Sequence, residues 1–197
     1  MLRALFRCIV LSALATLALA QQLPAADPPP STRLQALKAI EDPEPVARRA
    51  GVTRLGEVGT MADADRLVAR LRDDDAAVRR FAEAALWQVW SRSGDRAIDA
   101  LFLRGVRQMA ASQLVEALAT FSEIVRRKPA FAEGWNKRAT IYYLLSQYPL
   151  SIKDCDHVLK RNRNHFGVLA GYGQIYLALG DPDRAQPYFE RALRLWN

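Results

Sequence analysis

Three stretches of the sequence contain residue types that could do chemistry. Cys155 and His157 combine a nucleophile with a base, and the aspartates at 73–75 offer oxygen ligands for a cation. Glycines at 171, 173 and 180 could form a loop that binds phosphate. Spacing decides whether any of these stretches can work, because each type of site requires a particular arrangement of its residues.

The spacing does not favour a cysteine–histidine dyad. Residues two apart on a helix point to different faces, and a thiol nucleophile needs a base and an orienting group nearby. We expect Cys155 to be a small apolar residue packed in a helix, and His157 and His165 to be surface or helix-end residues. With two histidines in the sequence, a histidine-rich metal site is not expected.

The acidic run and the glycines also lack the context that a site needs. Residues 73–75 are without the spaced acids, central glycine and closing glutamate of a calcium loop, so they predict a helix cap and turn. No strand pattern precedes the glycines, as a phosphate loop requires. A nucleophile elbow and paired carboxylates are also missing from the sequence. We therefore predict a protein that is not an enzyme, with no catalytic residues, no metal and no cofactor.

The N-terminus has the features of an export signal. Arg3 and Arg7 precede an uncharged run, residues 8–20, that ends in Ala-Leu-Ala. We predict a signal peptide at 1–20 and a periplasmic location, with Cys8 too early to accept a lipid. The alternative is an uncleaved anchor, although the apolar run has about 13 residues and a spanning helix needs roughly 20.

The remaining chain favours a helical globular fold after a short tether. Residues 21–30, QQLPAADPPP, have little to bury and predict a flexible, partly extended segment. Half of all residues are hydrophobic and a quarter are charged, which is typical of a globular chain. Beyond the tether the apolar residues follow a helical period, and no sustained two-residue alternation occurs. The fold class predicted is all-α.

Basic residues are concentrated in the C-terminal half. Residues 31–95 hold eleven basic and eleven acidic residues, whereas 96–197 hold fifteen and nine, a net charge of +6. Clusters at 126–128, 160–163 and 191–194 fall at expected helix ends, where cations oppose the helix dipole. If a partner uses this charge in an exported protein, acidic peptides, anionic lipids or anionic polymers come before nucleic acid.

A repeat of 34 residues dominates the C-terminal half. Four columns of residues recur with this step and keep their size class: Leu101, Trp135 and Leu169; Gly105, Ala139 and Gly173; Ala117, Ser151 and Ala185; Phe121, Cys155 and Phe189. Small residues let two helices approach closely, and bulky residues fill the space beside them. The pattern predicts stacked helix pairs.

The period and residue types resemble the tetratricopeptide repeat, a helix–turn–helix unit. The second and third copies carry the resemblance best, through Trp135, Ala139, Tyr142, Tyr148 and Ser151, and through Leu169, Gly173, Tyr176, Gly180, Ala185, Phe189 and Ala192. The first copy is more divergent, with Arg104 and Gln108 at usually apolar positions. The copies are assigned to 98–131, 132–165 and 166–197, within a domain at 96–197.

A weaker repeat of 31 residues precedes this domain, in residues 31–95. Asp42, Arg48, Arg49, Gly51 and Leu55 recur as Asp73, Arg79, Arg80, Ala82 and Leu86. The pattern resembles HEAT-type helical repeats, in which acidic residues cap a helix and arginine pairs with the turn of the neighbouring repeat. We predict a right-handed α-solenoid of antiparallel pairs, two HEAT-like and then three tetratricopeptide pairs, with a continuous junction near 91–95 where Trp87 and Trp90 pack.

The resemblance implies that the first helices of successive pairs line a concave groove for a peptide or helix. Register assigns ten residues to it: Phe102, Val106, Met109, Asn136, Thr140, Tyr143, Leu144, Ala170, Gln174 and Leu177. This lining is mostly apolar, with amide and hydroxyl groups, and suits a peptide with hydrophobic anchors. We therefore expect a protein-binding scaffold of the cell envelope, with an acidic partner among the options.

Two further expectations concern surfaces outside the groove. The alternative function is an envelope-surface module whose basic helix ends hold anionic lipid or polymer, so that membrane contact is at most peripheral. Leu193 and Trp196 lie in the last turn of the third copy, where apolar side chains are expected to be exposed. We expect this end to self-associate or to dock a partner.

Overall fold

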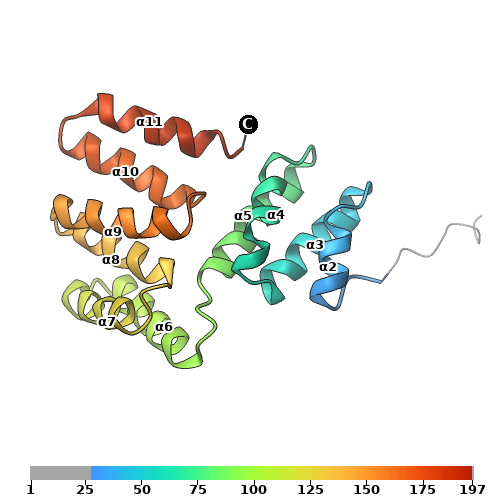
Figure 1. Cartoon of the computed structure of the whole chain (residues 1–197), viewed down its shortest axis with the longest axis horizontal. Helices are drawn as coiled ribbons and strands as arrows, with labels where there is room; N and C mark the ends of the chain where they lie inside the picture. Colours follow the sequence, from blue (N-terminus) through green and yellow to red (C-terminus); the bar gives the residue numbers. More distant parts are fainter. Residues whose placement is uncertain (1–27, 197) are drawn as a thin grey trace, which may run out of the picture.

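The computed structural model describes residues 28–196, and within them the fold is entirely helical (Figure 1). Ten α-helices and two short 3₁₀ helices occur there, without a strand, which confirms the predicted all-α class. None of the described helices is both long and apolar enough to cross a membrane. The signal peptide at 1–20 and most of the tether lie outside the described residues, so both stay predictions.

The helices form two groups joined by residues 91–95. The N-terminal unit consists of α2 (Arg33–Ala39), α3 (Pro45–Val58), η1 (Met61–Asp63), α4 (Ala64–Ala69), η2 (Arg70–Arg72) and α5 (Ala76–Trp90). The repeat array consists of α6 (Arg96–Ala110), α7 (Leu114–Arg127), α8 (Ala132–Leu144), α9 (Tyr148–Arg161), α10 (Phe166–Ala178) and α11 (Pro182–Leu193). Within the array, α6 packs on α7, α8 on α9 and α10 on α11, and each pair stacks on the next.

The 31-residue repeat corresponds to a repeated arginine contact in the N-terminal unit. The guanidinium of Arg48 donates to the main-chain carbonyls at 42 and 43, and that of Arg79 does the same at 73 and 74. Arg48 also forms a two-bond ion pair with Asp73, at 2.8 Å for each bond. The predicted pairing of arginine with the turn of the next repeat is therefore confirmed.

Asp75 caps α5, as predicted for the acidic run. Its carboxylate accepts the main-chain N–H groups of Ala77 and Val78, at 3.0 and 2.8 Å, and forms an ion pair with Arg49. The guanidinium of Arg49 and these N–H groups hold the pKa of Asp75 well below its usual range. The carboxylates of Asp73 and Asp75 are thus already paired with arginines and with the helix N-terminus.

The 34-residue repeat corresponds to the same close contact in the first and third helix pairs. A Cβ added to Gly105 would lie 2.7 Å from the ring of Phe121, and one added to Gly173 would lie 2.4 Å from the ring of Phe189. Only glycine permits this approach, because a methyl group would overlap the ring. The small-residue column therefore serves helix packing, as the sequence predicted.

The turns inside the helix pairs repeat as well. Ser112, Ser146 and Gly180, each 34 residues from the next, have φ angles of 58°, 57° and 75°. This left-handed conformation ends the first helix of a pair, and glycine adopts it at the lowest cost. Asp181 then caps α11 by accepting the N–H of Arg184. Gly180 therefore ends the turn after α10, and Asp181 starts α11.

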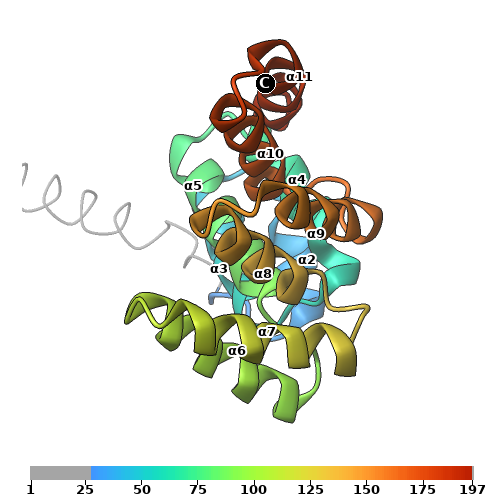
Figure 2. The ribbon, with the colours of Figure 1, turned by 90° about the vertical axis from the view of Figure 1, so that its left-hand side faces the viewer.

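The junction differs from the continuous one we expected. Helix α6 packs on α7 and α8 and does not stack along α5, and residues 91–95 lead the chain away from the N-terminal unit. The unit lies instead behind the array in the view of Figure 2, against the end of α9 and the start of α10. The physical reason is an aromatic cluster that draws α5 toward α10.

This aromatic cluster joins the two groups of helices. Trp90 stacks on His165 with ring centroids 4.4 Å apart, and Trp87 meets Phe166 edge-on at 5.2 Å. Trp196 meets the other side of Phe166 at 4.9 Å. The tryptophans are packing residues, as predicted, but they pack against the third copy of the repeat rather than the start of the first.

Candidate functional site

A hollow of about 120 Å³ lies between α8 and α10, on the face predicted to bind a partner. Four of the ten predicted residues line it: Asn136, Thr140, Tyr143 and Gln174. Gly167 and Gly171 contribute bare main chain on the α10 side. The structure therefore brings together the predicted residues of the second and third copies that face each other.

The hollow lies at the second repeat because small residues form its floor there. Ala139, Ser151 and Cys155 form this floor, and the Ser151 hydroxyl donates to the carbonyl of Ala139 at 2.8 Å. Cys155 occupies the column in which the flanking repeats have Phe121 and Phe189. The second repeat thus lacks a phenyl ring at this position, and the unfilled volume opens on the groove.

Gly171 makes the α10 wall open. No side chain or main chain of the described residues comes within 4 Å of where its Cβ would stand, apart from its own helix and chain neighbours. Asn136, on the opposite wall, is held in place because its amide donates to Glu133 at 2.9 Å. The hollow therefore has one open wall on α10, which is apolar except for Gln174, and an α8 wall on which Asn136 is held in place.

The other six predicted residues are outside the hollow. Phe102 is 4% exposed and packs edge-on against Phe121 and Phe131, so it is a core residue and not a contact for a ligand. The aromatic residues of the first copy enclose Phe102, so its side chain is not available to a ligand in the groove. Val106 and Met109 are half-buried and pack on the same aromatic cluster. Ala170 is also half-buried, whereas Leu144 and Leu177 are exposed.

A buried pair that the sequence analysis did not predict anchors the base of α8 and α10. His165 Nε2 lies 2.9 Å from a carboxylate oxygen of Glu133, and both side chains are fully buried. His165 Nδ1 accepts the N–H of Val168, which places the ring proton on Nε2, where it donates to Glu133. His165 is thus at a helix end, as expected, but it is not on the surface.

Glu133 remains ionised in this buried position. Burial alone would raise its pKa, but the hydrogen bond from His165 and the nearby positive charge of Lys137 outweigh burial and lower the pKa to about 2. No sequence motif marks the pair, because the two residues are 32 apart, at the starts of α8 and α10.

Cys155 and His157 do not form a reactive dyad. The thiol is buried, and burial raises its pKa to about 12, so the nucleophilic thiolate is scarce at neutral pH. His157 stacks on Trp135, with ring centroids 4.0 Å apart, on another face of α9. This arrangement matches the packing role that the sequence predicted for Cys155.

The C-terminal end is partly covered by the chain itself. Trp196 packs on Phe166 and on the core of the N-terminal unit, so it is not the free apolar surface that we expected. The Arg72 guanidinium donates to the carbonyl of Arg194 at the same place. Leu193 is 60% exposed and is the part of the prediction that the structure leaves available.

Comparisons with known proteins agree with the helix pairs. A family model described as tetratricopeptide repeat matches residues 167–195, which contain most of α10 and all of α11. A TPR repeat-containing protein of Rhizobium etli is 32% identical over 127 residues, 64% of this chain and 61% of the relative. The match thus spans about three fifths of that relative.

Two solved structures of MamA are also similar. One, a mutant, has a TM-score of 0.47 and 16% identity, covering 68% of this chain and 96% of that one. The other, titled MamA AMB-1, has a TM-score of 0.47 and 17% identity, covering 83% of this chain and 95% of that one. The family model thus marks a tetratricopeptide repeat at residues 167–195, and the related sequence and the three stacked helix pairs agree with this similarity.

Proposed function

We propose that the protein is a scaffold that binds a partner peptide or helix in the hollow between α8 and α10. Tetratricopeptide folds serve protein–protein interaction, and this one has an open groove wall at Gly171 and a vacant floor at Cys155. The observation that carries the proposal is the open space at Gly171, since a glycine needed only for packing would have a close neighbour, as Gly173 does.

The chemistry of the hollow favours a partner with an apolar anchor. Ala139, Cys155 and Ile175 provide apolar surface, and Tyr143 adds an aromatic ring beside it. Asn136, Thr140 and Gln174 supply amide and hydroxyl groups that can bind the main chain of an extended segment. The anchor would enter the volume that a phenyl ring fills in the flanking repeats.

The cellular location in this proposal is the envelope, reached through the signal peptide predicted at residues 1–20. A second candidate function, binding of anionic lipid or polymer, has one observation in its favour. The last turns of α7, α9 and α11 all carry basic residues. An acidic partner peptide would also be attracted to these helix ends.

Photo-crosslinking in intact cells tests the groove. A photoreactive amino acid at Gln174, which lines the hollow, should crosslink to one defined protein, while the same residue at the exposed Gln186 of α11 should not. Gly171→Leu should remove that crosslink by filling the hollow, and Tyr143→Ala should weaken partner binding about tenfold. A crosslink that persists in Gly171→Leu would contradict the proposal.

Salt separates the two candidate functions. Groove binding should persist at moderate ionic strength, because buried apolar contacts are not screened, and should depend on Tyr143. Binding that is lost at moderate salt and is insensitive to Tyr143→Ala would favour the basic helix ends.

A further inference from the structure

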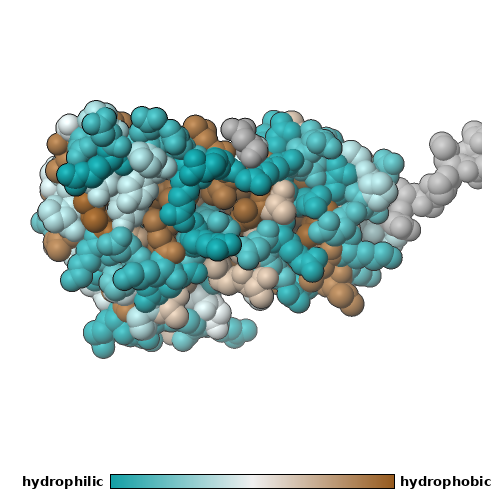
Figure 3. Space-filling view, turned by 45° about the horizontal axis from the view of Figure 1, so that its top comes forward, coloured by the Kyte–Doolittle hydropathy of each residue, from teal (hydrophilic) through white to brown (hydrophobic). Residues whose placement is uncertain are grey.

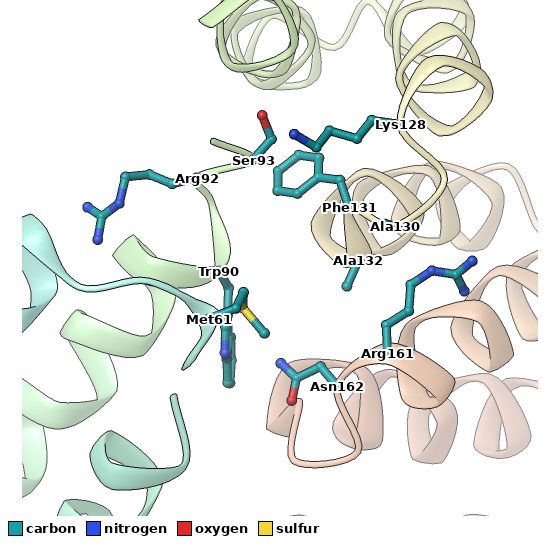
Figure 4. A pocket seen from close by; sticks show the side chains of 10 residues that line it. All are labelled: Met61, Trp90, Arg92, Ser93, Lys128, Ala130, Phe131, Ala132, Arg161 and Asn162. Atoms are coloured by element: carbon teal, nitrogen blue, oxygen red, sulfur yellow. The ribbon is translucent and has the colours of Figure 1, made fainter. Parts of the chain in front are cut away.

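A second, larger cavity of about 350 Å³ lies where the N-terminal unit meets the repeat array (Figure 4). Three parts of the chain surround it: the end of α5 with residues 92 and 93, the connection between α7 and α8, and the end of α9. Met61 from η1 completes the wall. Its volume is in the range of small-molecule sites, which begin at roughly 300 Å³.

Two residues that line this cavity each have a buried donor group without a partner. Trp90 Nε1 and Asn162 Nδ2 are buried and make no hydrogen bond to any described residue. The residues are 3% and 8% exposed, so bulk water does not readily satisfy them. A buried donor without an acceptor costs free energy, so a ligand that supplies an acceptor to these groups would stabilise the protein.

The orientation of Asn162 directs its donor into the cavity. Its side-chain oxygen accepts the N–H of Asn164 at 3.2 Å, which leaves the amide nitrogen on the other side. In Figure 4 this nitrogen points toward Met61 and Trp90. An amide flip would lose the bond from Asn164, so the donor direction is fixed by the fold.

The side chains that line the cavity carry a net positive charge. None of the described residues that line it is acidic, whereas Arg92, Lys128 and Arg161 are basic. The ammonium group of Lys128 points toward Ser93 across the cavity mouth, while both guanidinium groups turn outward (Figure 4). Arg92 donates to the carbonyl of Gly59 at 2.8 Å, and Arg161 to that of His157 at 2.6 Å.

The rest of the lining is apolar. Trp90, Phe131 and Met61 provide broad surfaces, and Ala130 and Ala132 are small. In the space-filling view, apolar residues are visible in the gap between the two groups of helices, framed by hydrophilic ones (Figure 3). A ligand that matches this site therefore needs an acceptor group with negative charge and an apolar body.

We propose that this cavity binds a small organic anion, with its oxyanion group on Asn162 Nδ2 and Trp90 Nε1 and its apolar part against Met61 and Phe131. Lys128, at the other end of the cavity, adds positive charge. A carboxylate and a phosphate ester share this chemistry. The ligand would contact both groups of helices and thereby hold them together. The site is separate from the groove between α8 and α10, and the two sets of lining residues do not overlap.

The indole N–H resonance of Trp90 gives a direct test. The described chain contains four tryptophans, and Trp90→Phe assigns the signal of Trp90 by its loss. Hexanoate and phenyl phosphate are titrated separately to about 10 mM, with hexanol and hexylamine as neutral and cationic controls. At least one anion should shift the Trp90 signal saturably, and which anion does so distinguishes a carboxylate from a phosphate ligand.

Two variants and one control variant locate the binding site. Asn162→Asp keeps the oxygen that accepts from Asn164 but replaces the donor with a negative acceptor, and it should weaken anion binding at least about tenfold. Lys128→Gln should weaken binding, whereas Arg126→Gln, which removes the same charge from the surface at the same helix end, should have little effect. The indole signals of the unliganded variants report whether the fold is intact.

Three results would overturn the proposal. The first is an unchanged Trp90 signal with both anions. The second is an equal shift with hexanol, because the oxyanion would then contribute nothing. The third is equal affinity of Asn162→Asp and the wild type, since the donor would then not take part.

Discussion

Gly171 and Gly173 are two residues apart in α10 and have opposite surroundings. The space beyond Gly171 is open, whereas the ring of Phe189 lies against Gly173. The two glycines therefore have different structural roles. Gly173 permits helix packing, and Gly171 leaves room on the side where a partner is proposed to bind.

The two glycines should respond oppositely to alanine. Gly171→Ala should raise the free energy of unfolding by about 0.5–1 kcal/mol, because alanine favours the helix and meets no neighbour. Gly173→Ala should lower it by about 1–3 kcal/mol, because the ring of Phe189 must move. Urea unfolding of both variants measures this, and a shift of the same sign in both would contradict it.

At the scale of the element, the turns inside the three helix pairs differ in backbone strain. Gly180 adopts the left-handed conformation without strain, but Ser112 and Ser146 adopt it with a side chain present. The third repeat is also the one that the family model matches. The first two turns therefore retain strain that the third does not have.

Glycine at either serine should stabilise the array. We expect Ser112→Gly and Ser146→Gly each to raise the free energy of unfolding by about 0.5 kcal/mol, because glycine adopts a positive φ without steric cost. Thermal or urea unfolding would detect the change.

Ala119→Gly is the matched control, since Ala119 is an exposed residue inside α7. It should lower the free energy of unfolding by about 1 kcal/mol. If glycine at Ser112 or Ser146 lowers the free energy of unfolding as Ala119→Gly does, the backbone of these turns is not strained.

Much of each element could be predicted from the sequence, because the relevant interactions are local or periodic. The 34-residue step located the contact between Gly173 and Phe189, and the 31-residue step located the contacts of Arg48. The repeat register wrongly placed Phe102 in the groove, because register does not account for the other aromatic residues of the first copy, which enclose that side chain.

Contacts between the two groups of helices left no periodic signal. Trp87 lies against Gly167, a residue 80 positions later in the chain, and only the folded arrangement brings them together. Glu133 and His165 are likewise brought together only when the starts of α8 and α10 pack side by side. The larger cavity exists because of the same arrangement, so no sequence pattern could have predicted it.

At the scale of the whole molecule, the buried Glu133–His165 pair lies beside the contact between the two groups of helices. Trp90 covers the ring of His165, and Lys137 approaches both Glu133 and the ring of Trp87. A change in the charge of Glu133 would therefore affect the array and its contact with the N-terminal unit together.

Acid should weaken this region in a defined window. The pKa of Glu133 is about 2 in the folded protein and 4.5 ordinarily, so its carboxylate stabilises the fold above about pH 4.5 and loses this effect as the pH falls toward 2. The contribution is about 3 kcal/mol at neutral pH, and less than half should remain at about pH 3.

Glu133→Gln isolates this effect in unfolding experiments. The difference in free energy of unfolding between wild type and Glu133→Gln should shrink as the pH falls from about 5 to about 3. Glu123→Gln, which removes an exposed carboxylate paired with Arg127, is the control and should show a small difference at every pH. A pH-independent difference for Glu133→Gln would contradict the assignment.

The N-terminal unit contacts the ends of two successive helix pairs, through Asn164 and His165 after α9 and through Arg194 after α11. In a repeat array each unit otherwise touches only its neighbours, so the angle between successive pairs is set locally. Here one group of helices holds both ends, so a change in the angle between the second and third pairs would strain one of the two contacts. The N-terminal unit therefore acts as a brace that limits how far these two pairs can twist against each other.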